Sequence, residues 1–243
     1  MSRSNPTETT VHPCTRWFTW DGDQGVVVWY DKVKKEQVEH PPKLTFVVLD
    51  RLCVINGFDK RNQCGIVSNE VRDTRTEKMV VRSFKGGLVA EGFYQDIKDK
   101  IKVAGASFAF SLYACYRPEP KGPVQLCNFR MSGCSRSAWM DFEKEHTLKA
   151  IYERAVRLDG FKEGKSGKIV FRAPVFKIAE LSPAGNDEAT KLDKEILQPY
   201  MESYFKRPTG TRADASHPAA EAPPAGNEEH VPEAPEEDTE VPF

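Results

Sequence analysis

The chain has 243 residues, of which 39% are hydrophobic and 29% charged, and its formal net charge is −1. A chain of this size buries one good-sized core, which favours one folded domain followed by a tail. No apolar run reaches the roughly 18 to 20 residues that cross a bilayer, and the polar residues 1–13 lack the regions of a signal peptide, so we expect a cytoplasmic protein without a membrane partner.

The first long strand is predicted at 43–55, a β-branched run between a Pro-Pro pair and an Asn-Gly pair. Two further strands, at 66–71 and 79–84, flank a charged stretch that is typical of the solvated tip of a hairpin. Gly86-Gly87 is expected to end this pairing.

A helix is predicted at 88–103, where apolar residues recur at intervals of four and Lys and Asp fill the other face. The strand 106–117 follows, with the side chains of Phe108 to Tyr116 at even positions on one face. Residues 124–131 are a further candidate strand.

Residues 135–157 have a helical pattern, and the three glycines of 160–167 predict a loop that ends it. Residues 168–181 predict a strand. Pro174 within it indicates an edge position, a bulge or a sheet corner, because proline donates no ladder hydrogen bond.

The last predicted element is an amphipathic helix at 186–205, broken or kinked at Pro199. Beyond it the composition shifts to Pro, Ala, Glu and Gly. Such a segment cannot bury enough apolar surface to offset its ordering entropy, so we expect a disordered tail.

Together the elements predict a mainly β protein with α additions, in the element order of the OB-fold: a five-stranded barrel with a helix between strands 3 and 4. In one mapping the fifth strand is 168–181 and residues 118–167 are an insertion. In the other mapping the fifth strand is 124–131 and 168–181 is an addition. The predicted parts are a flexible N-terminus (1–15), the OB-fold domain with an extra C-terminal helix (16–205) and the disordered acidic tail (206–243).

Charge divides the chain in two. All 35 Lys and Arg but only 27 of the 36 Asp and Glu lie in residues 1–212, which therefore carry +8, whereas 213–243 carry −9. A domain with that positive excess attracts polyanions, and the acidic tail presents the opposite field to the same surface.

Binding of a single nucleic-acid strand needs cations for the phosphates and exposed rings on which bases stack. The sequence interleaves both along the predicted strands and loops. The candidate DNA-binding residues are Trp17, Trp20, Trp29, Tyr30, Arg51, Lys60, Arg61, Arg72, Arg75, Arg82, Phe84, Lys85, Tyr116, Arg117 and Arg130.

The alternative for each aromatic residue is packing in the core or along a strand, where large rings are also favoured. Trp17, Trp20 and Trp29 in particular are consistent with a small N-terminal satellite core.

No metal site or cofactor is predicted, because the six cysteines include no C-x-x-C pair and no histidine at zinc-ligand spacing. Cys53 and Cys115 lie in apolar runs and are expected to be reduced core residues.

Catalysis has little support in the sequence. It contains no phosphate-binding loop, no nucleophile elbow and no H-E-x-x-H. Three histidines, among them His12, lie in segments expected to be flexible, which leaves His40 and His146. The carboxylates are dispersed among cations, unlike a two-metal nuclease, so we expect a protein that is not an enzyme.

The chain ends in an acidic run followed by Val-Pro-Phe, so that its last residue offers a ring together with the chain carboxylate. A partner can bind such an end in an apolar pocket rimmed by cations. The candidate partner-binding residues are Glu236, Glu237, Asp238, Glu240, Val241, Pro242 and Phe243.

This ending resembles the acidic tip of bacterial single-stranded DNA-binding proteins and the Phe-terminated tails of their tailed-phage counterparts, and the body is more similar to the phage type. Glu240 and Val241 depart from the bacterial tip. The resemblance implies a monomer or small homo-oligomer that coats single-stranded DNA during replication, recombination and repair, in the bacterial host cytoplasm if phage-encoded. It also implies a tail that recruits a polymerase, helicase, nuclease or annealing protein and competes with DNA.

The second hypothesis is an interaction or scaffold protein whose acidic tail docks on basic partners without any DNA.

Overall fold

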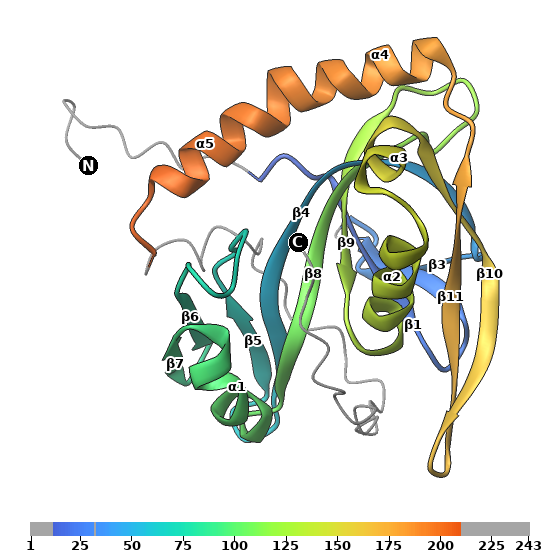
Figure 1. The fold of residues 1–243 in the computed structure, drawn as a ribbon. Helices are drawn as coiled ribbons and strands as arrows, with labels where there is room; N and C mark the ends of the chain where they lie inside the picture. The colour runs from blue at the N-terminus through green and yellow to red at the C-terminus, as the bar shows by residue number, and fades with distance from the viewer. Residues whose placement is uncertain (1–11, 32, 210–243) are drawn as a thin grey trace.

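The computed structural model describes residues 12–31 and 33–209, and the predicted tail residues from Glu236 to Phe243 lie outside this range. The fold is mainly β with α additions (Figure 1). Its strands are β1 (Arg16–Asp21), β2 (Val26–Asp31), β3 (Glu36–His40), β4 (Lys43–Asp59), β5 (Cys64–Ser68), β6 (Met79–Ser83), β7 (Gly87–Gly92), β8 (Ala106–Tyr116), β9 (Gln125–Met131), β10 (Ala155–Ser166) and β11 (Ile169–Ala179). Its helices are α1 (Tyr94–Val103), α2 (Gly133–Glu145), α3 (Leu148–Glu153), α4 (Pro183–Leu192), the π-helical η1 (Asp193–Leu197) and α5 (Gln198–Lys206).

All described strands belong to one open mixed sheet. Nine of them follow the order β3-β2-β1-β9-β8-β4-β5-β6-β7, and β10 with its partner β11 branches from β4. The 17-residue β4 is long enough to serve two neighbours on one edge: its first residues pair with β10 and its last with β5, while β8 runs along the other edge. The pairing of β1 with β9 is parallel and the other pairings are antiparallel.

The predicted closed OB barrel is therefore wrong for the described residues, because the sheet path ends at β3 and β7 without rejoining. Both rival candidates for the fifth strand exist, as β9 beside β8 and as β11 beside β10. Residues 118–167 are not an insertion, since β9 joins β8 to β1 and β10 extends the sheet from β4.

Two local predictions also need correction. Residues 87–92 form β7 on the far side of β6, so Gly86-Gly87 turns the chain and does not end the pairing, and helix α1 begins only at Tyr94. The predicted loop 160–167 lies mostly in β10. The tryptophans of β1 and β2 are part of the main sheet and not of a satellite core, because β1 pairs with β9.

Other predictions are confirmed. The hairpin of β5 and β6 exists. Pro174 lies on β11, a strand at the edge of the sheet whose partner among the described strands is β10, and it pairs with Phe161 next to a register shift. The predicted C-terminal helix exists, but its backbone stays helical through α4, η1 and α5, and the only irregularity in these described residues is the π-helical turn η1 shortly before Pro199, which cannot donate a backbone hydrogen bond. Cys53 and Cys115 are buried free thiols.

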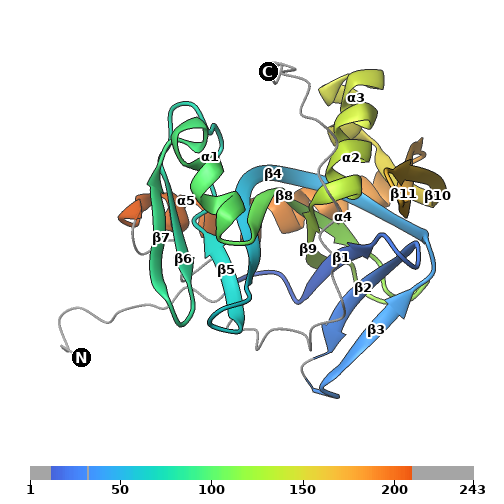
Figure 2. The same ribbon diagram turned by 90° about the horizontal axis from the view of Figure 1, so that it is seen from below.

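Two hydrophobic clusters lie on opposite faces of the central strands. The main core contains Phe46, Phe110 and Phe129 from the sheet together with residues of α1, α2 and α3. On the other face, Leu52 and Tyr113 pack against α4, η1 and α5. Seen from below in Figure 2, β5, β6, β7 and α1 form one side of the molecule, and β1 to β3, β10 and β11 form the other.

Within residues 12–31 and 33–209, no helix is both long enough and apolar enough to span a membrane.

Candidate nucleic-acid interface

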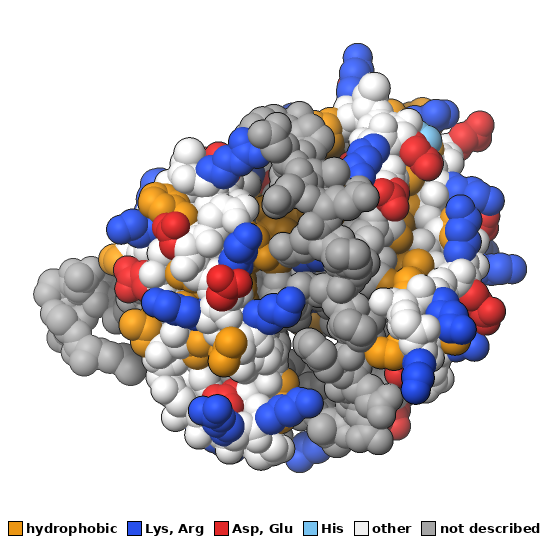
Figure 3. All heavy atoms as spheres, turned by 60° about the horizontal axis from the view of Figure 1, so that its bottom comes forward, with side chains coloured by type: hydrophobic (Ala, Val, Ile, Leu, Met, Phe, Trp, Pro, Cys, Tyr) orange, Lys and Arg blue, Asp and Glu red, His pale blue; other side chains and the backbone are white. Residues whose placement is uncertain are grey.

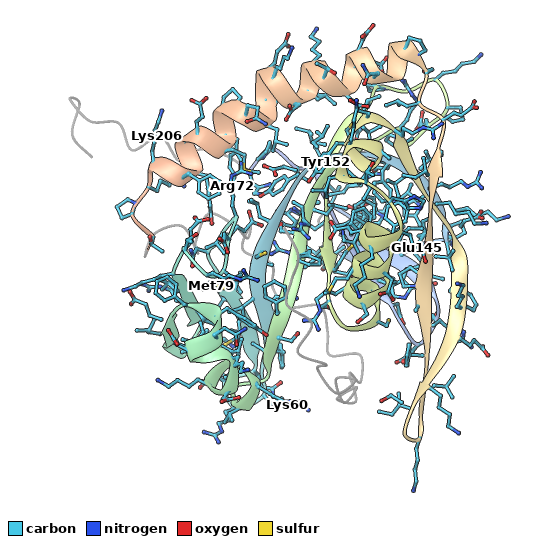
Figure 4. The ribbon with its side chains drawn as sticks, viewed as in Figure 1. Lys60, Arg72, Met79, Glu145, Tyr152 and Lys206 are labelled. Atoms are coloured by element: carbon cyan, nitrogen blue, oxygen red, sulfur yellow. The ribbon has the colours of Figure 1, made fainter. Side chains whose placement is uncertain are left out.

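The structure separates the candidate DNA-binding residues into groups. Tyr116 and Arg130 are 3% and 5% exposed and lie within the fold. Arg51 pairs with Glu143 at 2.8 Å, Arg72 with Asp50 at 2.9 Å and Arg117 with Glu188. In Figure 4, Arg72 lies beneath α5. These five side chains are therefore either buried or engaged in ion pairs within the fold.

The three candidate tryptophans are half-buried and held by neighbouring cationic residues. The guanidinium of Arg16 lies 4.4 Å from the ring centroid of Trp29, and that of Arg130 lies 5.2 Å from Trp17. The indole Nε1 of Trp20 donates to the carbonyl of Arg172 at 2.6 Å. His12, expected to be flexible, also packs here, with its ring centroid 4.3 Å from that of Trp17.

Tyr30 and Arg75 are exposed, but on separate parts of the fold. Tyr30 is 38% exposed on β2, near one edge of the sheet. Arg75 lies in the loop between β5 and β6.

The remaining five candidates come together at one place, the Phe84 tip, which consists of Lys60, Arg61, Arg82, Phe84 and Lys85. It is built by the β4–β5 turn and the β6–β7 turn. The two turns are joined because Ser83 Oγ donates to Asp59 Oδ2 at 3.2 Å and Lys85 Nζ donates to the carbonyl of Gln63 at 3.5 Å.

Asp59 organises the first of these turns. Its carboxylate accepts hydrogen bonds from the backbone N–H of Arg61 and from both the side chain and the backbone N–H of Asn62. The Asn62 side chain above all holds the pKa of Asp59 below its usual value. Within the described ranges this carboxylate forms no ion pair, since its oxygens accept hydrogen bonds within the turn and from Ser83. Among the described residues, Lys60, Arg61 and Lys85 form no ion pair, and all three are exposed.

The ring of Phe84 lies over Gly65 and is 49% exposed. A Cβ on Gly65 would lie 2.9 Å from Cε2 of Phe84, which is closer than real Cβ contacts allow, so the glycine is required for this ring position. The tip therefore combines an exposed aromatic ring with three cations that have no ion-pair partner in the described part of the chain, which is the combination that single-strand binding requires.

A second exposed group was missed by sequence reasoning. The β10–β11 hairpin carries Phe161, which is 41% exposed, and the exposed lysines 162, 165 and 168. The guanidinium of Arg172 lies 5.5 Å from the Phe161 ring centroid, and the backbone N–H of Arg172 donates to Gly22, which fixes the hairpin to the β1–β2 turn. We call residues 161–172 the hairpin arm.

A sequence signal for this hairpin exists. Ser166 pairs with Ile169, so the turn is the two-residue Gly167-Lys168, with Gly167 at a φ of 60°. Gly at the first position of a two-residue turn between strand-like runs is a hairpin signature.

Both exposed groups point the same way. In Figure 1 the turn that carries Lys60 and the end of the hairpin arm lie at the bottom of the molecule, away from α4 and α5. Figure 3 brings this side forward and shows Lys and Arg side chains on both of its flanks.

Away from the tip, beneath α5, a buried polar group that we call the Glu70 cluster consists of Glu70, Ser111, Tyr113, Arg130 and Tyr204. The Tyr113 hydroxyl donates to Glu70 Oε2 at 2.6 Å, and Arg130 Nη2 lies 3.6 Å from Glu70 Oε1. The backbone N–H of Glu70 donates to the Tyr204 hydroxyl at 2.6 Å. Desolvation raises the pKa of Glu70, against the opposing effects of Arg130 and of hydrogen bonds from Ser111 and Tyr113. This cluster links the sheet to the C-terminal helix.

The described residues hold no group of three or more His, Cys, Asp or Glu side chains that could bind a metal ion. Comparison of the chain with protein-family models, with curated proteins and with solved structures gives no match.

Proposed function

We propose that this protein binds and coats single-stranded DNA with little sequence preference and that the Phe84 tip is its principal contact. The observation that carries the proposal is the exposed ring of Phe84, seated on Gly65 where two joined turns carry three exposed cations that form no ion pair among the described residues. A base stacked on such a ring contributes roughly 1 to 3 kcal/mol for any base, because every base has a π-face.

Charge supports the same proposal. Residues 1–212 carry +8, and counterion release from the bound strand would supply an attraction that does not depend on sequence. The lysines of the hairpin arm would add phosphate contacts on the other flank of the same side. A closed barrel is not needed, since an open sheet can also present rings and cations on turns.

The second part of the proposal concerns the tail. Glu236 to Phe243 would recruit replication or recombination proteins and, with the −9 charge of residues 213–243, would compete with DNA for the tip. This part rests on the sequence and on its resemblance to phage single-stranded DNA-binding proteins.

The test is a salt-titrated gel shift with a single-stranded oligonucleotide, with duplex DNA and RNA as competitors. The full chain and a chain lacking residues 232–243 are compared. We expect both to shift the oligonucleotide and the shift to fade steeply with salt. The truncated chain should bind at least as tightly as the full chain and lose its capture of partner proteins.

A Lys85→Ala variant sharpens the test. If Lys85 contacts one phosphate, the slope of log affinity against log salt should become shallower by about 0.7. Lys191→Ala, which removes an exposed lysine on α4, is the matched control and should leave the slope unchanged. A scaffold protein would give no shift with any oligonucleotide, and metal-dependent cleavage of the oligonucleotide would indicate an enzyme.

A further inference from the structure

The sheet beside the Phe84 tip carries polar side chains with buried atoms that lack hydrogen-bond partners. In the register of the sheet, Asn56 on β4 pairs with Val67 on β5, which pairs with Arg82 on β6. The three side chains therefore lie in one row on one face. Both Asn56 Oδ1 and Arg82 Nε are buried. Among the described residues, Asn56 Oδ1 accepts no hydrogen bond and Arg82 Nε donates none.

This row lies next to the Phe84 ring. Phe84 lies in the turn directly after β6, and its ring occupies the face of the sheet on which a Cβ of Gly65 would lie, which is also the face of Val67. Its ring lies over Gly65, which is two residues before Val67 and pairs with Phe58. Asn56 is therefore a diagonal neighbour of Gly65, at a separation that long or aromatic side chains bridge.

A buried acceptor without a partner costs free energy comparable to a lost hydrogen bond, and native proteins keep few of them. Buried side-chain atoms without a hydrogen-bond partner also occur in the interior of the described fold, for example Trp29 Nε1 beside the main core and Glu70 Oε1 in the Glu70 cluster. The position of the acceptor beside an exposed ring indicates that a ligand completes it.

We propose that Asn56 Oδ1 accepts a hydrogen bond from the exocyclic amino group of the base stacked on Phe84. The protein then binds cytosine in preference to uracil or thymine at this position. Cytosine presents an N4–H₂ donor where uracil and thymine present the O4 acceptor. If the base is uracil or thymine, Asn56 Oδ1 faces the O4 oxygen. Two acceptors form no hydrogen bond with each other, and both have lost their contact with water. This inference rests on the proposed function.

The experiment measures the affinity of the full chain for (dC) and (dU) oligonucleotides of equal length at one salt concentration. The two differ on the edge that Asn56 would contact, and neither carries the thymine methyl group. We expect (dC) to bind about fivefold more tightly, which is the effect of one net hydrogen bond. Equal affinities would overturn the base preference and leave DNA binding intact, whereas no binding of either would overturn the proposed function as well.

Two further arms assign the preference to Asn56. Asn56→Leu keeps the side-chain size and should lower the (dC) affinity to that for (dU), while Asn186→Leu on α4 should change neither. Oligonucleotides whose cytosines carry a dimethylated N4 have no donor and should bind the unaltered protein like (dU), a result that does not depend on how any variant folds. A preference for (dC) that survives both changes would contradict the role of Asn56.

Discussion

The Glu70 cluster and the Phe84 tip both contain cationic residues, yet they differ in what these residues contact. In the cluster, Arg130 faces Glu70, and Tyr113 and Tyr204 hydrogen-bond to the same residue. At the tip, Lys60 and Lys85 have no ion-pair partner among the described residues, and the carboxylate of Asp59 is engaged in its own turn. The charges of the cluster are buried and face each other, whereas the cations of the tip are exposed and face no opposite charge among the described residues, which leaves them available to a ligand.

The largest expected effect comes from breaking the cluster. Glu70→Ala removes the counter-charge of the buried Arg130 and the acceptor of the Tyr113 hydroxyl. We expect the free energy of unfolding to fall by about 3 to 5 kcal/mol, because the variant leaves a buried charge uncompensated. Urea denaturation measures this loss. Glu91→Ala on the exposed edge of β7 is the control, and equal stability of the two variants would show that the cluster is not structural.

The next largest effect is expected on DNA binding and not on stability. Phe84→Ala removes a ring that is 49% exposed, so we expect little change in stability but about tenfold weaker binding of single-stranded DNA. Tyr152→Ala removes an aromatic ring that is 39% exposed on α3 and should bind DNA like the unaltered protein. Fluorescence anisotropy with a labelled oligonucleotide compares them. Equal losses in both variants would mean that the tip has no special role.

Part of the fold could be predicted because it depends on local patterns. The run 43–55 and the alternation of 106–117 identify β4 and β8, and the even residues Phe110 and Leu112 do face the main core. The pairing of strands that are distant in sequence has no such local pattern. The parallel pairing of β1 with β9 joins residues more than a hundred positions apart, and it extends the sheet to β2 and β3.

Glycine explains the missed strands. Gly164 was interpreted as loop, but in β10 its missing side chain is replaced by the Phe171 ring, which lies 2.5 Å from where a Cβ would be. Gly160 has a φ of 94° at the register shift of the hairpin. In the sequence, a glycine at a β-bulge or beneath an aromatic ring cannot be distinguished from a glycine in a loop. The sequence alone therefore did not identify β10 as a strand.

The candidate site shows the same limit. Lys60, Arg61, Phe84 and Lys85 were identified because basic and aromatic residues adjoin turns. Alternation places Arg130 on one face of β9, but its contacts are with Glu70 and Trp17, which are distant in sequence. Tyr116 was misjudged because its face of β8 packs into the main core.

The smallest predicted effect tests the electrostatics of the cluster through pH. Burial raises the pKa of Glu70 above its ordinary value of 4.5, so the folded state retains the proton to higher pH than the unfolded state does. Ionisation of Glu70 is therefore more costly in the folded protein. The stabilising contribution of the protonated carboxyl is complete below about pH 4.5 and is lost as the pH rises through the folded pKa.

Comparison with Glu70→Gln, which cannot ionise, isolates this contribution because the other titrating groups are common to both proteins. The unfolding free energy of the unaltered protein, minus that of the variant, should decrease from about pH 4 to pH 7 in urea denaturation. A difference that rises with pH would mean that Arg130 and the hydrogen bonds outweigh desolvation and lower the pKa instead. In that case ionisation of Glu70 would favour the folded state, and the contrast of the cluster with the Phe84 tip would be greater still.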